Sequence, residues 1–179
     1  MTRHALEHVI RAASGIALDA EFLVLGSQAV LGSFPEAPPE LLVSRELDVY
    51  PKNKPEAADL IHRVMGEGSS FDETFGYYAH AVSPELATLP AGWEQRLIRV
   101  STENMAGVVG WCLEIHDLAV SKLAAGRDKD MEFVRGLLRH RLADLRTIEQ
   151  RMIGTTLVES ERESLRDRLH HLAAEASLP

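Results

Sequence analysis

The amino-acid sequence predicts an α+β domain in which a small mixed β-sheet is joined to a C-terminal helical layer. Short apolar or alternating runs, bounded by Gly and Pro, lie between residues 21 and 113, and helical periodicity runs from His116 to the end. The length of 179 residues, 45% of them hydrophobic and 26% charged, is typical of one globular domain. We therefore expect an α/β core over residues 1–115 and a helical part over 116–179, packed as one compact unit.

Charge and cysteine content exclude several classes of protein. The 27 acidic and 19 basic side chains give a formal charge of -8, so a nucleic-acid contact would need a local basic patch. A single cysteine, Cys112, excludes an internal disulfide framework and a multi-cysteine metal site, and is typical of a reducing compartment. No apolar run approaches the roughly 20 residues of a membrane span. We expect a cytoplasmic protein with no membrane partner.

The N-terminal third predicts a helix, a strand, a short helix and a second strand. Leu6, Val9 and Ala13 follow helical spacing within residues 2–19. The apolar run over 21–25 stops at Gly26 and predicts a buried strand, after which 28–31 form a turn or two of helix before a proline-rich loop. Residues 46–50 alternate polar and apolar side chains, which predicts a strand with both acids on one face.

The remaining elements follow from the same rules. A helix is expected over residues 55–65, and aromatic and branched residues predict strands over 74–82, 94–100 and 108–113. Four helices are expected over 117–125, 129–139, 144–152 and 160–176.

Two neighbouring features carry the predicted chemistry. Glu46 and Asp48, alternate residues of one strand, place two carboxylates within about 7 Å, where their repulsion favours a bound cation. Mg²⁺ takes oxygen ligands and leaves room for phosphate, so this pair suits nucleotide-dependent phosphoryl chemistry. At the preceding turn, Gly26 lets the backbone approach a phosphate, and Ser27 with the N–H groups of the helix start can hold anionic oxygens.

A Gly-Ser turn followed by an acidic-hydrophobic-acidic-hydrophobic strand resembles the DNA polymerase β-type nucleotidyltransferase superfamily. A second block, His116 to Asp130, resembles the lysine and aspartate motifs of the AbiEii-type bacterial branch. The resemblance implies a nucleotidyltransferase-type sheet and Mg²⁺-dependent transfer of a nucleoside monophosphate from an NTP to an acceptor hydroxyl, on a tRNA, a protein or another molecule. It also implies site roles: nucleotide binding by Gly26 and Ser27, Mg²⁺ binding by Glu46 and Asp48, a triphosphate contact by Lys122, and completion of the site by Asp130 or Asp128.

The sequence departs from the family pattern at the third carboxylate. The superfamily commonly places that acid on a later strand between hydrophobic residues, where this chain offers His80 between Ala79 and Ala81. The general base for the acceptor hydroxyl is therefore unassigned. The first acid is Glu46 rather than Asp, which alters where an ion would sit relative to Asp48.

Plainer interpretations stay open. Glu46 and Asp48 can form the solvated face of an edge strand, and Lys122 can belong to a basic patch or to an exposed helix paired with nearby aspartates. The missing acid suggests an alternative function, a catalytically inactive binding or regulatory module of a toxin–antitoxin system. A third alternative is a partner protein or homodimer contact through a C-terminal stripe of Leu165, Leu169, Leu172 and Ala176.

Overall fold

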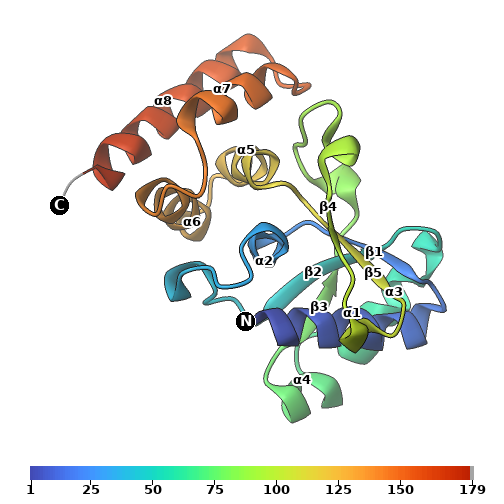
Figure 1. Ribbon diagram of the computed structural model, residues 1–179. Helices are drawn as coiled ribbons and strands as arrows, with labels where there is room; N and C mark the ends of the chain where they lie inside the picture. The colour runs from blue at the N-terminus through green and yellow to red at the C-terminus, as the bar shows by residue number, and fades with distance from the viewer. Residues whose placement is uncertain (178–179) are drawn as a thin grey trace. The chain divides into compact units, whose positions relative to one another are not determined.

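The computed structural model describes residues 1–177 and separates into two compact units (Figure 1). The first, here called the sheet unit, comprises Met1–Pro84 and Leu97–Leu113. The second, here called the helical unit, comprises Glu85–Arg96 and the chain from Glu114 onward.

A five-stranded mixed sheet forms the centre of the sheet unit. The strands are β1 (Glu21–Val24), β2 (Glu46–Pro51), β3 (Tyr78–Ala81), β4 (Ile98–Val100) and β5 (Val109–Cys112). Their order is β3-β2-β1-β5-β4; β1 is antiparallel to β2 and parallel to β5, β2 is parallel to β3, and β4 is antiparallel to β5. The predicted α+β fold class with a small mixed sheet is confirmed.

Helix α1 (Arg3–Ala17) covers one face of this sheet, as Figure 1 shows. The Thr2 hydroxyl caps its first turn by accepting a hydrogen bond from Ala5 N at 3.2 Å. Ile10 lies so close to β5 that a Cβ on Gly110 would be 2.7 Å from Ile10 Cδ1, which accounts for glycine in that strand.

Short helices connect the strands of the sheet unit. The α-helices are α2 (Val30–Ser33), α3 (Ala58–Met65) and α4 (Ser70–Phe75), and the 3-10 turns of this unit are η1 (Ser27–Ala29), η2 (Pro39–Leu41), η3 (Pro55–Ala57) and η6 (Glu103–Met105). The chain also contains η4 (Pro84–Leu86) and η5 (Trp93–Arg96).

Two predicted strands are wrong at their N-terminal ends. Residues 74 and 75 belong to α4, because the Ser69 hydroxyl caps that helix at Asp72 N and Gly76 ends it with φ 73°. Residues 94–96 belong to η5, where the Arg96 guanidinium binds the buried Asp117 carboxylate at 2.8 Å. The aromatic and branched residues that suggested longer strands lie partly in these helical turns.

The helical unit contains α5 (Ile115–Ala125), α6 (Asp128–Arg139), α7 (Leu145–Ile153) and α8 (Glu159–Ala176). Glu114 and Asp144 cap α5 and α7 by accepting backbone N–H bonds from the first turn of each helix. All four predicted C-terminal helices are present, each within two residues of its expected ends.

The apolar stripe of α8 is occupied inside this unit. Leu165, Leu169 and Leu172 are buried where α8 packs on α6 and α7. An ion pair of 3.0 Å joins Arg135 of α6 to Glu175 of α8. This stripe is therefore core, and the expectation that it docks on a second chain is wrong.

Across residues 1–177, no helix combines the length and the apolar character needed to span a membrane.

Candidate active site

The two acids predicted as a metal site lie side by side on β2. Burial alternates along this strand: Leu47 and Val49 are fully buried, whereas the Glu46 and Asp48 side chains are 25% and 24% exposed. The acids therefore share the open face of the strand, as the period-two pattern predicts. Because β2 lies between β3 and β1, the interpretation of an edge strand with solvating acids is wrong.

The turn after β1 meets the second acid. Leu25 N donates a 3.1 Å hydrogen bond to Asp48 O, which extends the pairing of β1 and β2 to the turn. Gly26 is buried, and a Cβ built on it would lie 2.6 Å from Asp48 Cγ. Glycine is needed here because any larger residue would occupy the position of the Asp48 carboxylate. Ser27, half-buried, begins η1 immediately afterwards.

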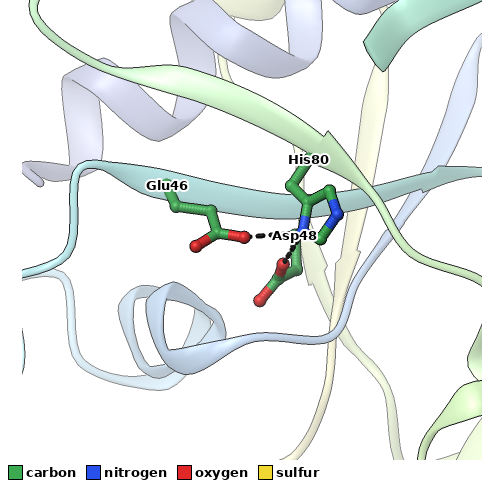
Figure 2. A group of neighbouring side chains, drawn as sticks. All are labelled: Glu46, Asp48 and His80. Atoms are coloured by element: carbon green, nitrogen blue, oxygen red, sulfur yellow. Dashed lines mark hydrogen bonds and ion pairs between the residues drawn. The ribbon is translucent and has the colours of Figure 1, made fainter. Parts of the chain in front are cut away.

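His80 completes the group from the neighbouring strand. In the parallel pairing of β2 and β3, Asp48 is the register partner of His80. The His80 Nδ1 atom lies 2.6 Å from Glu46 Oε1 and 3.3 Å from Asp48 Oδ1, so one ring nitrogen faces both carboxylates (Figure 2). The His80 side chain is 45% exposed, which leaves the group open to solvent and to ligands.

These three side chains fit a divalent cation. One ligand atom from each of Glu46, Asp48 and His80 lies within 4.8 Å of the other two. Two carboxylate oxygens carry the negative charge that a hard divalent cation requires, and an imidazole nitrogen is a common third ligand of transition ions. In the described part of the chain, this group has the composition and spacing of a metal site.

The lysine and aspartate of the second motif meet within the helical unit. Lys122 Nζ donates to Asp130 Oδ1 at 2.9 Å, and Arg127 Nε donates to Asp130 Oδ2 at 2.6 Å. The side chain of Lys122 is 12% exposed and that of Asp130 is 1% exposed, so the ion pair between these two residues is largely buried. Asp128 is exposed at the start of α6, so Asp130 is the aspartate that positions Lys122.

Two opposing effects set the pKa of Asp130. Burial raises the pKa of this carboxyl, but hydrogen bonds and charges from Arg127 and Lys122 lower it more, so the net pKa is below the ordinary value. Asp130 is therefore ionised at neutral pH and holds the Lys122 ammonium in place.

A comparison with protein families decides the class of this chain. The family described as "Nucleotidyltransferase of unknown function (DUF6036)" matches residues 4–174. The chain belongs to this nucleotidyltransferase family. No curated protein and no solved structure matches the chain significantly.

The nucleotidyltransferase family match covers every residue that the sequence analysis assigned to the site. Within the sheet unit, the structure brings together Gly26, Glu46 and Asp48, with Ser27 next in the chain. Within the helical unit, it brings together Lys122 and Asp130.

One neighbour of the site had no role in the sequence analysis. The ring of His62, on α3, lies 5.4 Å from the His80 ring, centroid to centroid. His62 is exposed and belongs to a helix with no motif of its own. Only the packing of α3 against β3 brings the two rings together, and local sequence holds no signal for that contact.

Proposed function

We propose that this protein transfers a nucleoside monophosphate from an NTP to an acceptor hydroxyl at the Glu46–Asp48 face of β2. One observation carries the proposal: the Gly26 backbone at the end of β1 is packed against the Asp48 carboxylate. A phosphate-binding turn and a metal-binding acid would therefore act at one place. Membership of a nucleotidyltransferase family supports the reaction class.

In this proposal Glu46 and Asp48 hold a divalent cation, for which the sequence analysis expects Mg²⁺. When bound, the cation neutralises phosphate charge and polarises the phosphorus that is attacked. Gly26 and Ser27 bind the triphosphate through the backbone and the Ser27 hydroxyl. The acceptor oxygen forms a bond to the α-phosphorus, the bond from that phosphorus to pyrophosphate breaks, and the hydroxyl proton passes to water.

Lys122 supplies the positive charge for the triphosphate in this proposal. Within the helical unit, its ammonium group is held by the buried Asp130 carboxylate, so the conformation of the Lys122 side chain is set before substrate arrives. A lysine fixed by a following aspartate is the feature that resembles the AbiEii-type branch. Asp130 is thus a positioning residue that acts through Lys122.

The acceptor in this proposal is a hydroxyl group. A tRNA, a protein or a small molecule each offers a hydroxyl, and the loops that select among them differ widely between proteins of one fold. We propose a cytoplasmic reaction, because the single cysteine is typical of a reducing compartment.

The test is transfer of label from α-³²P-labelled NTPs to total RNA, to added protein and to the protein itself. Asp48→Asn should abolish both divalent-cation binding and labelling, because the amide lacks the negative charge that the cation needs. Asp59→Asn, an exposed acid on α3, is the matched control and should retain both. Transfer by Asp48→Asn at the wild-type rate would contradict the proposal.

A second candidate function is a nucleotide-binding regulatory module without catalysis, as in a toxin–antitoxin pair. It is favoured by His80, which stands where a third carboxylate is expected. Calorimetry with each NTP and a divalent cation separates the two candidates: binding without pyrophosphate release supports the module. An absence of binding would exclude both.

A further inference from the structure

The neighbouring strand gives the acid pair a histidine in place of a third acid. His80 is in register with Asp48 on the parallel strand β3, between Ala79 and Ala81. It points to the same face as Glu46 and Asp48, as Figure 2 shows. The residue at this register position is the one placed to share a ligand with both acids.

Distances within the group support a shared ligand. The His80 Nδ1 atom lies within 3.3 Å of an oxygen of each acid, 2.6 Å from Glu46 and 3.3 Å from Asp48. Two carboxylates can therefore bring up to two negative charges to one ring nitrogen, and a divalent cation matches that charge better than one proton does. All three side chains stay partly exposed, so a cation can reach them from solvent.

The donor atoms then determine which cation is preferred. Mg²⁺ takes oxygen ligands and binds imidazole poorly. Mn²⁺ also suits carboxylate oxygens, and as the first member of the transition-ion affinity series for nitrogen, oxygen and sulfur ligands it accepts an imidazole nitrogen more readily than Mg²⁺ does.

From these contacts we infer that His80 is the third protein ligand of this site, which therefore binds Mn²⁺ in preference to Mg²⁺. The inference rests on the proposed function for the use of the site. It replaces the Mg²⁺ that the family resemblance implies with Mn²⁺. Glu46 and Asp48 supply the charge, and the His80 ring nitrogen supplies the selectivity.

A purely structural role for His80 makes a different prediction. If His80 only occupies the space between the two acids and pairs with them, its removal would leave two repelling carboxylates open to solvent and strengthen cation binding. If His80 is a ligand, its removal weakens Mn²⁺ binding. The sign of the change therefore separates the two roles.

The experiment measures Mn²⁺ binding to the intact, nucleotide-free protein by the loss of the free-ion EPR signal, with Mg²⁺ as competitor. Wild-type protein should bind Mn²⁺ at least tenfold more tightly than Mg²⁺. Loss of a supporting residue around a metal typically costs about 10–100-fold in affinity, so His80→Ala should weaken Mn²⁺ binding by at least about tenfold. His80→Asp, which supplies a third carboxylate, should bring the Mn²⁺ and Mg²⁺ affinities close together.

A spectroscopic measurement tests whether the His80 ring nitrogen binds Mn²⁺ directly. Electron spin-echo modulation of bound Mn²⁺ should show coupling to a ¹⁴N nucleus in the wild type and none in His80→Ala or His80→Asp. His62→Ala is the matched control, since this exposed histidine lies 5.4 Å from His80 and outside the ligand group. It should leave both the affinity and the coupling unchanged, and circular dichroism of each variant checks that it is folded.

The outcomes separate this inference from the proposed function. Mn²⁺ binding without nitrogen coupling, or coupling lost in His62→Ala, would overturn the assignment of His80 while leaving transfer at Glu46 and Asp48 intact. Nitrogen-coupled Mn²⁺ in a protein that transfers no nucleotide would support the His80 site and contradict the catalytic proposal. Failure of Mn²⁺ to bind the nucleotide-free protein would overturn the His80 site, and failure of any divalent cation to bind with an NTP present would overturn the proposed function as well.

Discussion

The backbone of Gly26 and the carboxylate of Asp48 occupy adjoining space at the end of β1. A Cβ on Gly26 would lie 2.9 Å from Asp48 Cβ and 2.6 Å from Asp48 Cγ, so this glycine and this acid depend on each other. Leu25 N binds Asp48 O next to this contact and fixes the register. The turn and the acid are thus positioned by the sheet itself, before any ligand binds.

Gly26→Ala should therefore damage the site and the fold together. The added methyl group would push the Asp48 side chain out of its position, and overpacking of this kind typically costs about 1–3 kcal/mol in the free energy of unfolding. Cation affinity should fall at the same time, because Asp48 is moved relative to Glu46. Urea unfolding and Mn²⁺ titration measure the two effects.

Gly15→Ala is the matched control for this substitution. Gly15 lies inside α1, and apart from its chain neighbours and the backbone of its own helix no atom lies within 4 Å of its Cβ position, so alanine adds helix propensity there and should stabilise the protein by up to about 1 kcal/mol. Cation affinity should be unchanged. A Gly26→Ala protein with wild-type stability and wild-type cation affinity would contradict the close packing of Gly26 against the Asp48 side chain.

Asp130→Asn should destabilise the helical unit by about 3 kcal/mol, because it leaves the buried Lys122 ammonium without its countercharge. The effect depends on pH with a defined sign. The pKa of Asp130 is lowered in the folded state, so its contribution is present above the ordinary Asp pKa and is lost as pH falls below about 4. The difference in unfolding free energy between wild type and variant should shrink over that range, as urea titrations from pH 7 to pH 3 would measure.

Asp128→Asn serves as the control for the Asp130 prediction. Asp128 is exposed two residues earlier in the chain, and a surface substitution of this kind changes stability by less than about 0.5 kcal/mol. A loss of stability by Asp130→Asn that stays constant down to pH 3 would contradict the ionised state assigned to Asp130.

Local pattern was sufficient to predict the elements of the site. The alternation of Glu46 and Asp48 with Leu47 and Val49 predicts one strand with an acidic face, and the structure has that burial pattern. The glycine that ends the first apolar run predicts the turn at Gly26. Both signals are local, since they depend on residues close together in the chain and on the period of one element.

Local pattern was insufficient where the answer depends on strand pairing or on helix caps. That His80 faces both acids depends on the register of β3 against β2, more than 30 residues away in sequence. The Ser69 hydroxyl caps helix α4, so residues 74 and 75 are helical where aromatic and branched content suggested the start of a strand. The choice between Asp128 and Asp130 likewise required the fold, because spacing alone allows either to reach Lys122.

The single cysteine should be chemically inert in the folded protein. Cys112 is fully buried at the end of β5, and a Cβ on Gly32 of α2 would lie 3.1 Å from its Sγ atom. Burial raises the pKa of its thiol to about 12, so at pH 8 only about one molecule in ten thousand carries the reactive thiolate. Ellman's reagent at pH 8 should therefore give no colour with native protein and one equivalent of thiol in 6 M guanidinium chloride.

Ser70→Cys, at an exposed position in α4, provides the matched reactive thiol and should add one rapidly reacting equivalent. Native wild-type protein that reacts as fast as the Ser70→Cys thiol would show that α2 opens readily from the end of β5.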